Sequence, residues 1–328
     1  MPIGNNLQKS LGNSCKFSIV SISRLTDLQL EIKGKQKQGL FDKEFADRYL
    51  PTFSFSPPYE LKDAKSLIIV AMPRPLTRAT FCWKGKKRSF ILPPTYTAYD
   101  EKRIQIEKLV LEGVRNEGYK IATPKLPLKL LAVHSGLAEY GRNNIAYVQG
   151  MGSFMRLTAV YSDMPCEKDF WQQEKVLKRC DKCDLCLKAC PTGAISSTRF
   201  LLKAERCLTF HNEKEGNVPF PDWIRPEWHN CIIGCIRCQA VCPENRPYLK
   251  LFGESAEFDE QETKLLLNGT TSNLIPQSTL IKMQKLSLTD YFNEIPRNLS
   301  ILLEKAAENQ QTETKSTEKN TEVGKAKG

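Results

Sequence analysis

The cysteines of this 328-residue chain are concentrated in one region, which opens with the stretch C-D-K-C-D-L-C-L-K-A-C-P at residues 180–191. The spacing C-x2-C-x2-C-x3-C-P is typical of segments that bind 4Fe-4S clusters. Short spacers let three thiolates converge on one face of a cubane, while the fourth thiolate points away to a second cluster. The four cysteines of this run are Cys180, Cys183, Cys186 and Cys190.

A second, shorter run follows at residues 235–243 with the spacing C-x2-C-x3-C-P, and Cys207 stands alone between the two runs. Together the runs and Cys207 offer eight ligands, which is enough for two clusters. Because the last cysteine of each run crosses to the other cluster, we expect a first cysteine set of Cys180, Cys183, Cys186 and Cys242. The second cysteine set is then Cys190, Cys207, Cys235 and Cys238.

Two alternatives to this assignment stay open. Pairs of cysteines two residues apart also form structural zinc sites, although a four-cysteine run closed by proline favours iron. Cys231 precedes Cys235 by four residues and could replace Cys207 as a ligand, although a buried free thiol is favoured. Cys15, Cys82 and Cys166 have no partner at ligand spacing and are predicted to be small core residues.

Composition places the chain among cytoplasmic globular proteins. Twelve cysteines in 328 residues are too sparse for a disulfide scaffold. The longest apolar run, Leu67–Met72, is too short to cross a membrane, and the first ten residues contain no apolar signal core. We therefore expect cytoplasmic localisation and no membrane partner.

The charge balance, 48 basic against 37 acidic side chains, gives a net charge of +11. Each 4Fe-4S cluster with four thiolates carries about −2 when oxidised, so two clusters would reduce the net charge to roughly +7. The basic excess is too small to require a nucleic-acid partner.

Residues 1–165 alternate between strand and helix patterns and predict a layered α/β domain. Strands are expected at 16–23, 66–72, 119–122, 145–148 and 154–161, a hairpin at 80–92, and helices at 25–38, 101–116 and 128–140. Residues 166–250 form the predicted cluster domain. Residues 251–306 are predicted as a helical extension with helices at 259–268 and 278–294, and the polar tail 307–328 as disordered.

Several motifs in order resemble the epoxyqueuosine reductase and reductive dehalogenase superfamily. They are S-G-L-A-E-Y-G-R-N-N at 135–144, G-S-F-M-R-L-T-A-V-Y-S-D at 152–163, the run at 180–195, R-C at 206–207, and G-C-I-R-C-Q-A-V-C-P-E-N at 234–245. The resemblance covers roughly residues 65–249. It implies a nitroreductase-like α/β domain followed by a bacterial-ferredoxin-type double-cluster domain.

The resemblance also implies a reaction. Enzymes of this kind pass electrons one at a time through two clusters to a cobalamin bound base-off, which drives reductive removal of a hydroxyl or halide. A small reduced donor such as ferredoxin or flavodoxin would supply the electrons. Two alternatives stay open: an FMN-dependent reductase on the same frame, and a non-catalytic ferredoxin-type electron donor.

Proton donation is where this sequence departs from the resemblance. Epoxyqueuosine reductases carry an aspartate at the position that corresponds to Ala122, whereas dehalogenases use a tyrosine. Tyr119 lies in the same stretch and is the predicted acid, with packing against a short strand as its alternative role. Cofactor-lining candidates from the resembling motifs are Arg142, Asn143, Asn144 and Arg156; the first three could instead form a polar turn, and Arg156 could be solvated.

The resemblance ends before the helical repeats that help such reductases to hold tRNA, because residues 251–306 are too few for that array. Residues 81–90, F-C-W-K-G-K-K-R-S-F, combine basic and aromatic side chains that could contact RNA, but a solvated hairpin tip is favoured. A tRNA substrate is thus disfavoured.

Overall fold

The computed structural model describes residues 3–304, so the tail predicted to be disordered at 307–328 lies outside the described residues. The chain forms two compact units, each assembled from segments far apart in sequence. Within the described range, the first unit contains residues 3–76, 94–207 and 237–253, and the second contains 77–93, 208–236 and 254–304. The domains predicted at residues 1–165, 166–250 and 251–306 stay a prediction.

A four-stranded sheet forms the centre of the first unit, with strand order β1-β2-β8-β5 and antiparallel pairing throughout. The register pairs Ile69 of β2 with both Ser18 of β1 and Ala159 of β8. The strands are β1 (Lys16–Ser21), β2 (Ser66–Pro73), β5 (Ile121–Ala122) and β8 (Met155–Ser162). Both central strands are buried along most of their length, because helices cover both faces of the sheet.

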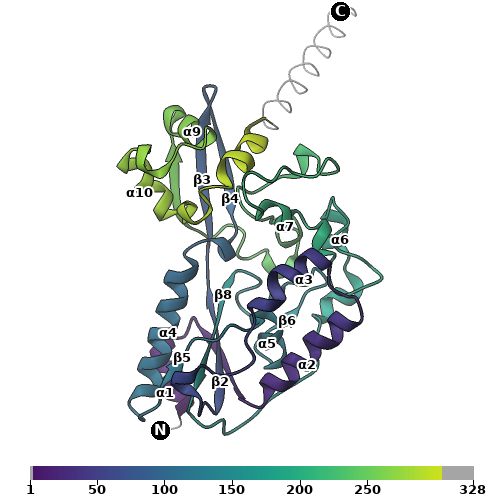
Figure 1. Cartoon of the computed structure of the whole chain (residues 1–328), viewed down its shortest axis with the longest axis vertical. Coiled ribbons are helices and arrows are strands. Elements are labelled where there is room, and N and C mark those ends of the chain that lie inside the picture. Colours follow the sequence, from purple (N-terminus) through teal and green to yellow (C-terminus); the bar gives the residue numbers. More distant parts are fainter. Residues whose placement is uncertain (1–2, 305–328) are drawn as a thin grey trace, which may run out of the picture. The chain divides into compact units, whose positions relative to one another are not determined.

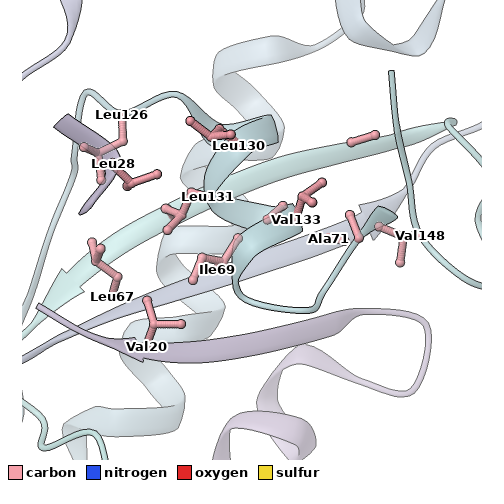
Figure 2. Close-up of a cluster of buried hydrophobic side chains, with 14 of the residues drawn as sticks. Val20, Leu28, Leu67, Ile69, Ala71, Leu126, Leu130, Leu131, Val133 and Val148 are labelled. Carbon is pink, nitrogen blue, oxygen red and sulfur yellow. The ribbon is translucent and has the colours of Figure 1, made fainter. Parts of the chain in front are cut away.

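One face of this sheet packs on α2 (Arg24–Lys37) and α5 (Leu128–His134), as the labelled elements in Figure 1 show. Figure 2 shows the core on this side, where Ile69 and Leu67 of β2 meet Leu131 and Val133 of α5. Helix α5 ends sooner than the predicted limit of 140, since Gly136 adopts a left-handed φ of 74° and turns the chain into the short strand β6 (Glu139–Tyr140).

The opposite face packs on α1 (Ile3–Leu11) and α4 (Tyr99–Arg115), which contact each other closely. Gly113 permits that approach, because a Cβ atom there would lie 2.6 Å from the Ser10 hydroxyl and 3.0 Å from the Leu7 Cα. Val110 and Ile106 of α4 join the core against Ile68 and Val160 of the sheet. The remaining elements of this unit are α3 (Lys43–Tyr49), β7 (Ala146–Tyr147), α6 (Leu185–Ala189) and α8 (Arg237–Ala240).

The second unit contains a three-stranded sheet with the order β4-β3-β9. Strands β3 (Leu76–Trp83) and β4 (Lys86–Leu92) form the predicted hairpin, and β9 (Phe252–Phe258) is a strand that no sequence pattern predicted. Helices α7 (Leu208–Asn212), α9 (Glu260–Leu267) and α10 (Gln277–Lys285) follow, and residues 295–304 are helical. The single helix predicted over 278–294 is interrupted at Ser287, whose φ is 57°.

The predicted mixed α/β fold class is confirmed. None of the helices within residues 3–304 combines the length and apolar character needed to span a bilayer.

Candidate metal centre and adjoining cavity

The first cysteine set lines one small cavity in the first unit, which we call the cysteine cavity. Cys180 lies in a 3-10 turn over Lys178–Lys182, and Cys186 lies in the short helix α6. Cys242 precedes the 3-10 turn Pro243–Asn245, so the second run meets the first at this point. Among residues 3–304, no three cysteine, histidine or acidic side chains are arranged to hold a single metal ion. The four thiols share the walls of a cavity instead, which is the donor set that a cubane takes.

Burial and mutual repulsion affect the protonation of these thiols. Burial raises the pKa of Cys186 to about 11, with further increases from the neighbouring Cys180, Cys242 and Cys183. Burial also raises the pKa of Cys180, against a lowering by the Arg142 N–H group. Four thiolates therefore need a strong positive charge between them, which the iron ions of a cluster would supply while protons are released.

Arg142 holds the loop that carries the first two cysteines. Its Nε donates to the carbonyl oxygen of Cys183 at 3.0 Å, and its Nη2 donates to the carbonyl oxygen of Cys180 at 2.5 Å. The backbone N–H of Arg142 also points at the Cys180 Sγ, 3.4 Å away. The structure thus places this predicted cofactor-lining residue against the cysteine cavity, and its corrinoid role stays a prediction.

The neighbouring asparagines shape the turn between β6 and β7. Asn143 is buried, and its Nδ2 donates to the Tyr147 hydroxyl at 2.9 Å. Asn144 has a left-handed φ of 58°, and its N–H closes the turn on the Gly141 carbonyl at 2.9 Å. Both residues are therefore held in place by the hairpin, and their predicted cofactor contacts stay predictions.

Tyr147 is the residue of this site that sequence reasoning missed. Its side chain hydrogen-bonds Cys242 as well as Asn143, and burial followed by the Cys242 contact raises the pKa of Tyr147 far above its ordinary value. The hydroxyl stays protonated and can donate to the sulfur. No signal in the sequence marks this contact, because 95 positions separate the two residues along the chain.

A cavity of about 740 Å³ adjoins the cysteine cavity, and we call it the adjoining cavity. The two share the wall residues Tyr147, Leu177 and Glu244. Its other walls come from the edge strand β1 and from residues 135–139 and 147–152. This volume is in the range of cofactor and small-molecule sites.

Gly152 is required in the wall of the adjoining cavity. Its φ is 59°, and a Cβ atom there would lie 2.4 Å from the Asn245 Oδ1 and 2.9 Å from the Glu244 carbonyl oxygen. Asn245 in turn accepts from the Ser153 N–H at 2.8 Å. The G-S motif thus packs directly against the end of the second cysteine run.

Two predicted site residues lie elsewhere in the first unit. Arg156 is on β8, where its Nη2 donates to the Thr95 carbonyl at 3.0 Å, and it lines a separate cavity. Tyr119 packs against the core beside α4. Their assigned roles, as cofactor ligand and proton donor, remain predictions.

The second cysteine set and Cys231 show different environments. Cys190 contacts the Thr192 hydroxyl at 3.5 Å, while Cys235 accepts from the Asn230 Nδ2 at 3.2 Å. Cys231 is fully buried and donates to the Asn230 Oδ1 at 3.2 Å. Ligation by Cys190, Cys207, Cys235 and Cys238 stays a prediction. The three cysteines outside the cluster region are Cys15, which is buried in the core, and Cys82 and Cys166, which are partly exposed.

Comparison with known proteins agrees with the cysteine spacing. Residues 179–245 match the family of the 4Fe-4S double cluster binding domain. An epoxyqueuosine reductase from Francisella cf. novicida is 28% identical over 181 residues, which cover 54% of this chain and 48% of that protein. The chain thus matches about half the length of this curated relative.

Solved epoxyqueuosine reductases share the fold. One from Bacillus subtilis, described with its catalytic aspartate loop swung out of the active site, has a TM-score of 0.64 at 21% identity and covers 92% of this chain and 80% of its own. Another, bound to an epoxyqueuosine-modified tRNA-Tyr stem loop, has a TM-score of 0.60 with the same identity and coverage. The resemblance predicted from the motifs is confirmed: this chain contains a 4Fe-4S double cluster binding domain at residues 179–245, within a fold that it shares with epoxyqueuosine reductases.

Proposed function

We propose that this chain is an iron-sulfur reductase that uses two 4Fe-4S clusters and a base-off cobalamin for reductive removal of a hydroxyl or halide. The observation that carries the proposal is the shared wall between the cysteine cavity and the adjoining cavity, made by Tyr147, Leu177 and Glu244. Electrons arriving at the first cysteine set would need to cross only this wall to reach a cofactor in the adjoining cavity.

The residues available to hold the cofactors follow from this arrangement. The first cysteine set would hold one cluster and the second cysteine set the other. Cobalamin, when bound, supplies a strongly reducing cobalt centre that expels the leaving group. Asn143 and Asn144 in the β6–β7 turn would hold Tyr147, a residue of the shared wall, in place beside the cofactor. Arg142 would hold the loop that carries Cys180 in its present conformation.

The proton that accompanies loss of a hydroxyl must come from this chain or from water. The B. subtilis relative is described with a catalytic aspartate loop. The motif resemblance places Ala122 of this chain at the position where such reductases carry the aspartate. We keep Tyr119 as the proposed acid. A Tyr119→Phe variant that turns over at the wild-type rate would remove it from the mechanism.

The electron donor and the substrate are also part of the proposal. A small reduced ferredoxin or flavodoxin would deliver electrons. One solved relative holds a modified tRNA stem loop, but a small-molecule substrate is favoured here because the hairpin lysines are partly paired within their own unit: Lys87 forms an ion pair with Glu257.

The decisive experiment is anaerobic reconstitution with iron, sulfide and hydroxocobalamin, followed by metal and flavin analysis. We expect about eight irons and one cobalt per chain, with absorbance near 400 nm that bleaches on reduction. Bound FMN in place of cobalt would establish the flavin alternative, and reducible clusters with neither cofactor would establish an electron donor. Stoichiometric zinc would overturn the cluster assignment.

Matched variants separate the two sites. Cys186→Ser should lower the iron content to about four, whereas Cys231→Ser should keep eight, because Cys231 is buried against Asn230. Gln149 lies at the exposed rim of the adjoining cavity, so Gln149→Trp would fill the cavity. This variant should lose cobalt binding and keep its full iron content. Gln105→Trp, exposed on α4, is the control and should bind cobalt normally.

A further inference from the structure

Asn230 is a half-buried residue of the second unit that lies five positions before the predicted cluster ligand Cys235. Its Oδ1 accepts from the Ile236 N–H at 2.9 Å and from the Cys231 thiol at 3.2 Å. Its Nδ2 donates to the Trp228 carbonyl at 3.1 Å and to the Cys235 Sγ at 3.2 Å. One amide thus contacts two cysteines, of which only Cys235 is assigned to a cluster.

The partners of Asn230 determine which end of its amide faces Cys235. A backbone N–H can only donate and a backbone carbonyl can only accept. The oxygen of the amide must therefore face Ile236, and the nitrogen must face Trp228. The nitrogen also lies against the Cys235 sulfur, so Asn230 offers this sulfur a hydrogen-bond donor.

The backbone of the loop that leads to Cys235 is held by other side chains. Asn212 Nδ2 donates to the Gly234 carbonyl at 2.8 Å, and Asn298 Nδ2 donates to the Ile232 carbonyl at 2.8 Å. Asn298 is 1% exposed and also donates to the Asn212 carbonyl at 3.0 Å. Because these bonds fix the loop, a change in the Asn230 side chain should leave the course of the chain unaltered.

The position of Cys231 is explained by the same amide. Cys231 is fully buried, and its thiol donates to the Asn230 Oδ1. Ligation of iron would require Cys231 to lose its proton. The thiolate would then face the amide oxygen with no proton between them, which is unfavourable. Cys231 is thus suited to be a protonated partner of Asn230.

We propose that Asn230 is a positioning residue for the second cluster, whose amide donates to the Cys235 sulfur and raises the reduction potential of that cluster. A hydrogen bond to a ligand sulfur stabilises the more negative, reduced state. Cys231 keeps its proton and completes the acceptor end of the amide. This inference rests on the proposed two-cluster function and adds to it a residue that tunes the second cluster.

The test combines an EPR redox titration with HYSCORE spectroscopy on the anaerobic holoprotein, labelled with nitrogen-15 asparagine. In the wild type we expect a hyperfine coupling between a reduced cluster and an asparagine nitrogen. Asn230→Asp keeps the shape and the acceptor oxygen of the side chain but removes the donor, so this coupling should disappear. The ratio of reduced to oxidised cluster at a fixed potential should fall about tenfold, which equals about 59 mV for a one-electron couple.

Two variants are the controls. Asn268→Asp adds the same charge at the exposed end of α9 and should keep both the coupling and the potential of the wild type. Cys231→Ser keeps a donor for the Asn230 Oδ1 and should also keep both, with unchanged iron content. A loss of about four irons in Cys231→Ser would identify Cys231 as a ligand and overturn the proposal.

Failure of this inference can be told apart from failure of the proposed function. Asn230→Asp with full iron content and the potential and coupling of the wild type would overturn the inference alone. If Asn230→Asp did not retain iron, the wild-type spectrum would decide, because the absence of any asparagine coupling would exclude the hydrogen bond and its presence would support it. A wild-type protein that holds well under eight irons would contradict the proposed function instead.

Discussion

At the scale of single residues, Tyr147 connects strand β7 to the first cysteine set through its contact with Cys242. Its hydroxyl contacts Cys242 and accepts from Asn143, and it stands in the wall of two cavities. Hydrogen bonds to cluster sulfurs stabilise the more negative, reduced state and so raise the reduction potential. Tyr147 would thus position Cys242, one of the predicted cluster ligands.

Tyr147→Phe should therefore lower the reduction potential of one cluster by on the order of tens of millivolts, with the iron content unchanged. A redox titration followed by EPR spectroscopy measures this directly. Tyr140→Phe is the matched control, since Tyr140 is equally buried in the paired strand β6 but does not line the cysteine cavity. An identical potential in the two variants would contradict the assigned contact.

Sequence reasoning at this scale succeeds where ligands are close along the chain. The C-x2-C-x2-C-x3-C spacing predicts that Cys180, Cys183 and Cys186 share a cavity, since short spacers leave them little freedom. The contacts of Arg142 with the same loop bridge 38 or more positions and follow from tertiary packing alone. No local pattern encodes such a contact.

At the scale of elements, a partly buried ion pair connects α2 to α5. His134 Nε2 lies 2.7 Å from the Glu31 Oε2, its Nδ1 meets the Gln172 carbonyl at 2.5 Å, and its ring stacks on Trp171. Burial alone would lower the pKa of His134, but the hydrogen bonds with Glu31 and Gln172 outweigh burial and raise it above its ordinary value of 6.5. Burial raises the pKa of Glu31, but the bonds with His134 and Lys35 lower it overall.

These shifts predict a pH-dependent stability. Because the folded-state pKa of His134 is raised, its contribution is complete below pH 6.5 and disappears as the pH rises through the raised pKa. The contribution of Glu31 is complete above pH 4.5 and disappears as the pH falls through its lowered pKa. His134→Gln should cost about 1–3 kcal/mol of unfolding free energy near pH 6, and less at pH 8.5.

Urea unfolding of the wild type and the variant at the two pH values tests this prediction. Lys43→Gln, which removes an exposed ion pair with Asp47, is the control and should cost little at either pH. A pH-independent cost in His134→Gln would show that the histidine is neutral in the folded protein.

The hairpin of β3 and β4 gives a second prediction at this scale. Its two-residue turn, Lys84–Gly85, has both φ values positive, and both N–H groups donate to the Glu260 carboxylate at 2.8 and 3.1 Å. Glu257 forms an ion pair with Lys87. Acidic side chains of β9 and α9 thus already bind the backbone and one lysine of the basic hairpin tip.

Replacing Lys84, Lys86 and Lys87 together by alanine should accordingly change the salt dependence of RNA binding very little. Three lysines in direct contact with phosphates would contribute roughly 2 to 3 to the slope of log Kd against log salt. We expect a change below one, measured with a tRNA anticodon stem loop. A change near the full value would make the hairpin an RNA contact.

The predicted elements hold best where local signals are strong. The helix predicted at 259–268 matches α9 closely. Asp259 and Glu262 form a capping box at its beginning, and Gly269, with a φ of 64°, ends it. Strand β9 was not predicted because its sequence, F-G-E-S-A-E-F, lacks a strong apolar alternation and is half exposed. Its pairing with β3 joins segments about 170 positions apart, which a local pattern cannot reveal.

At the scale of the whole molecule, apolar burial is distributed unevenly along the chain. The two core clusters of the first unit come from the central sheet and from the helices α1, α2, α4 and α5 that cover it, and they contain none of the eight predicted ligands. The segment 179–245 contains only short helices and turns. Segments of this kind depend on bound metal for much of their stability.

Removal of iron should consequently loosen residues 179–245 and leave the central sheet folded. Hydrogen exchange measured by mass spectrometry, before and after anaerobic chelation, should show a loss of protection of at least tenfold in peptides that contain Cys180–Cys190. Peptides from β2 and β8 should keep their protection, because their burial against α4 and α5 involves none of the eight predicted ligands. If β2 and β8 lost protection to the same extent, the cluster segment and the sheet would form one cooperative folding unit. The wall residues Tyr147, Leu177 and Glu244, which the two cavities share, would then be the contacts that couple them.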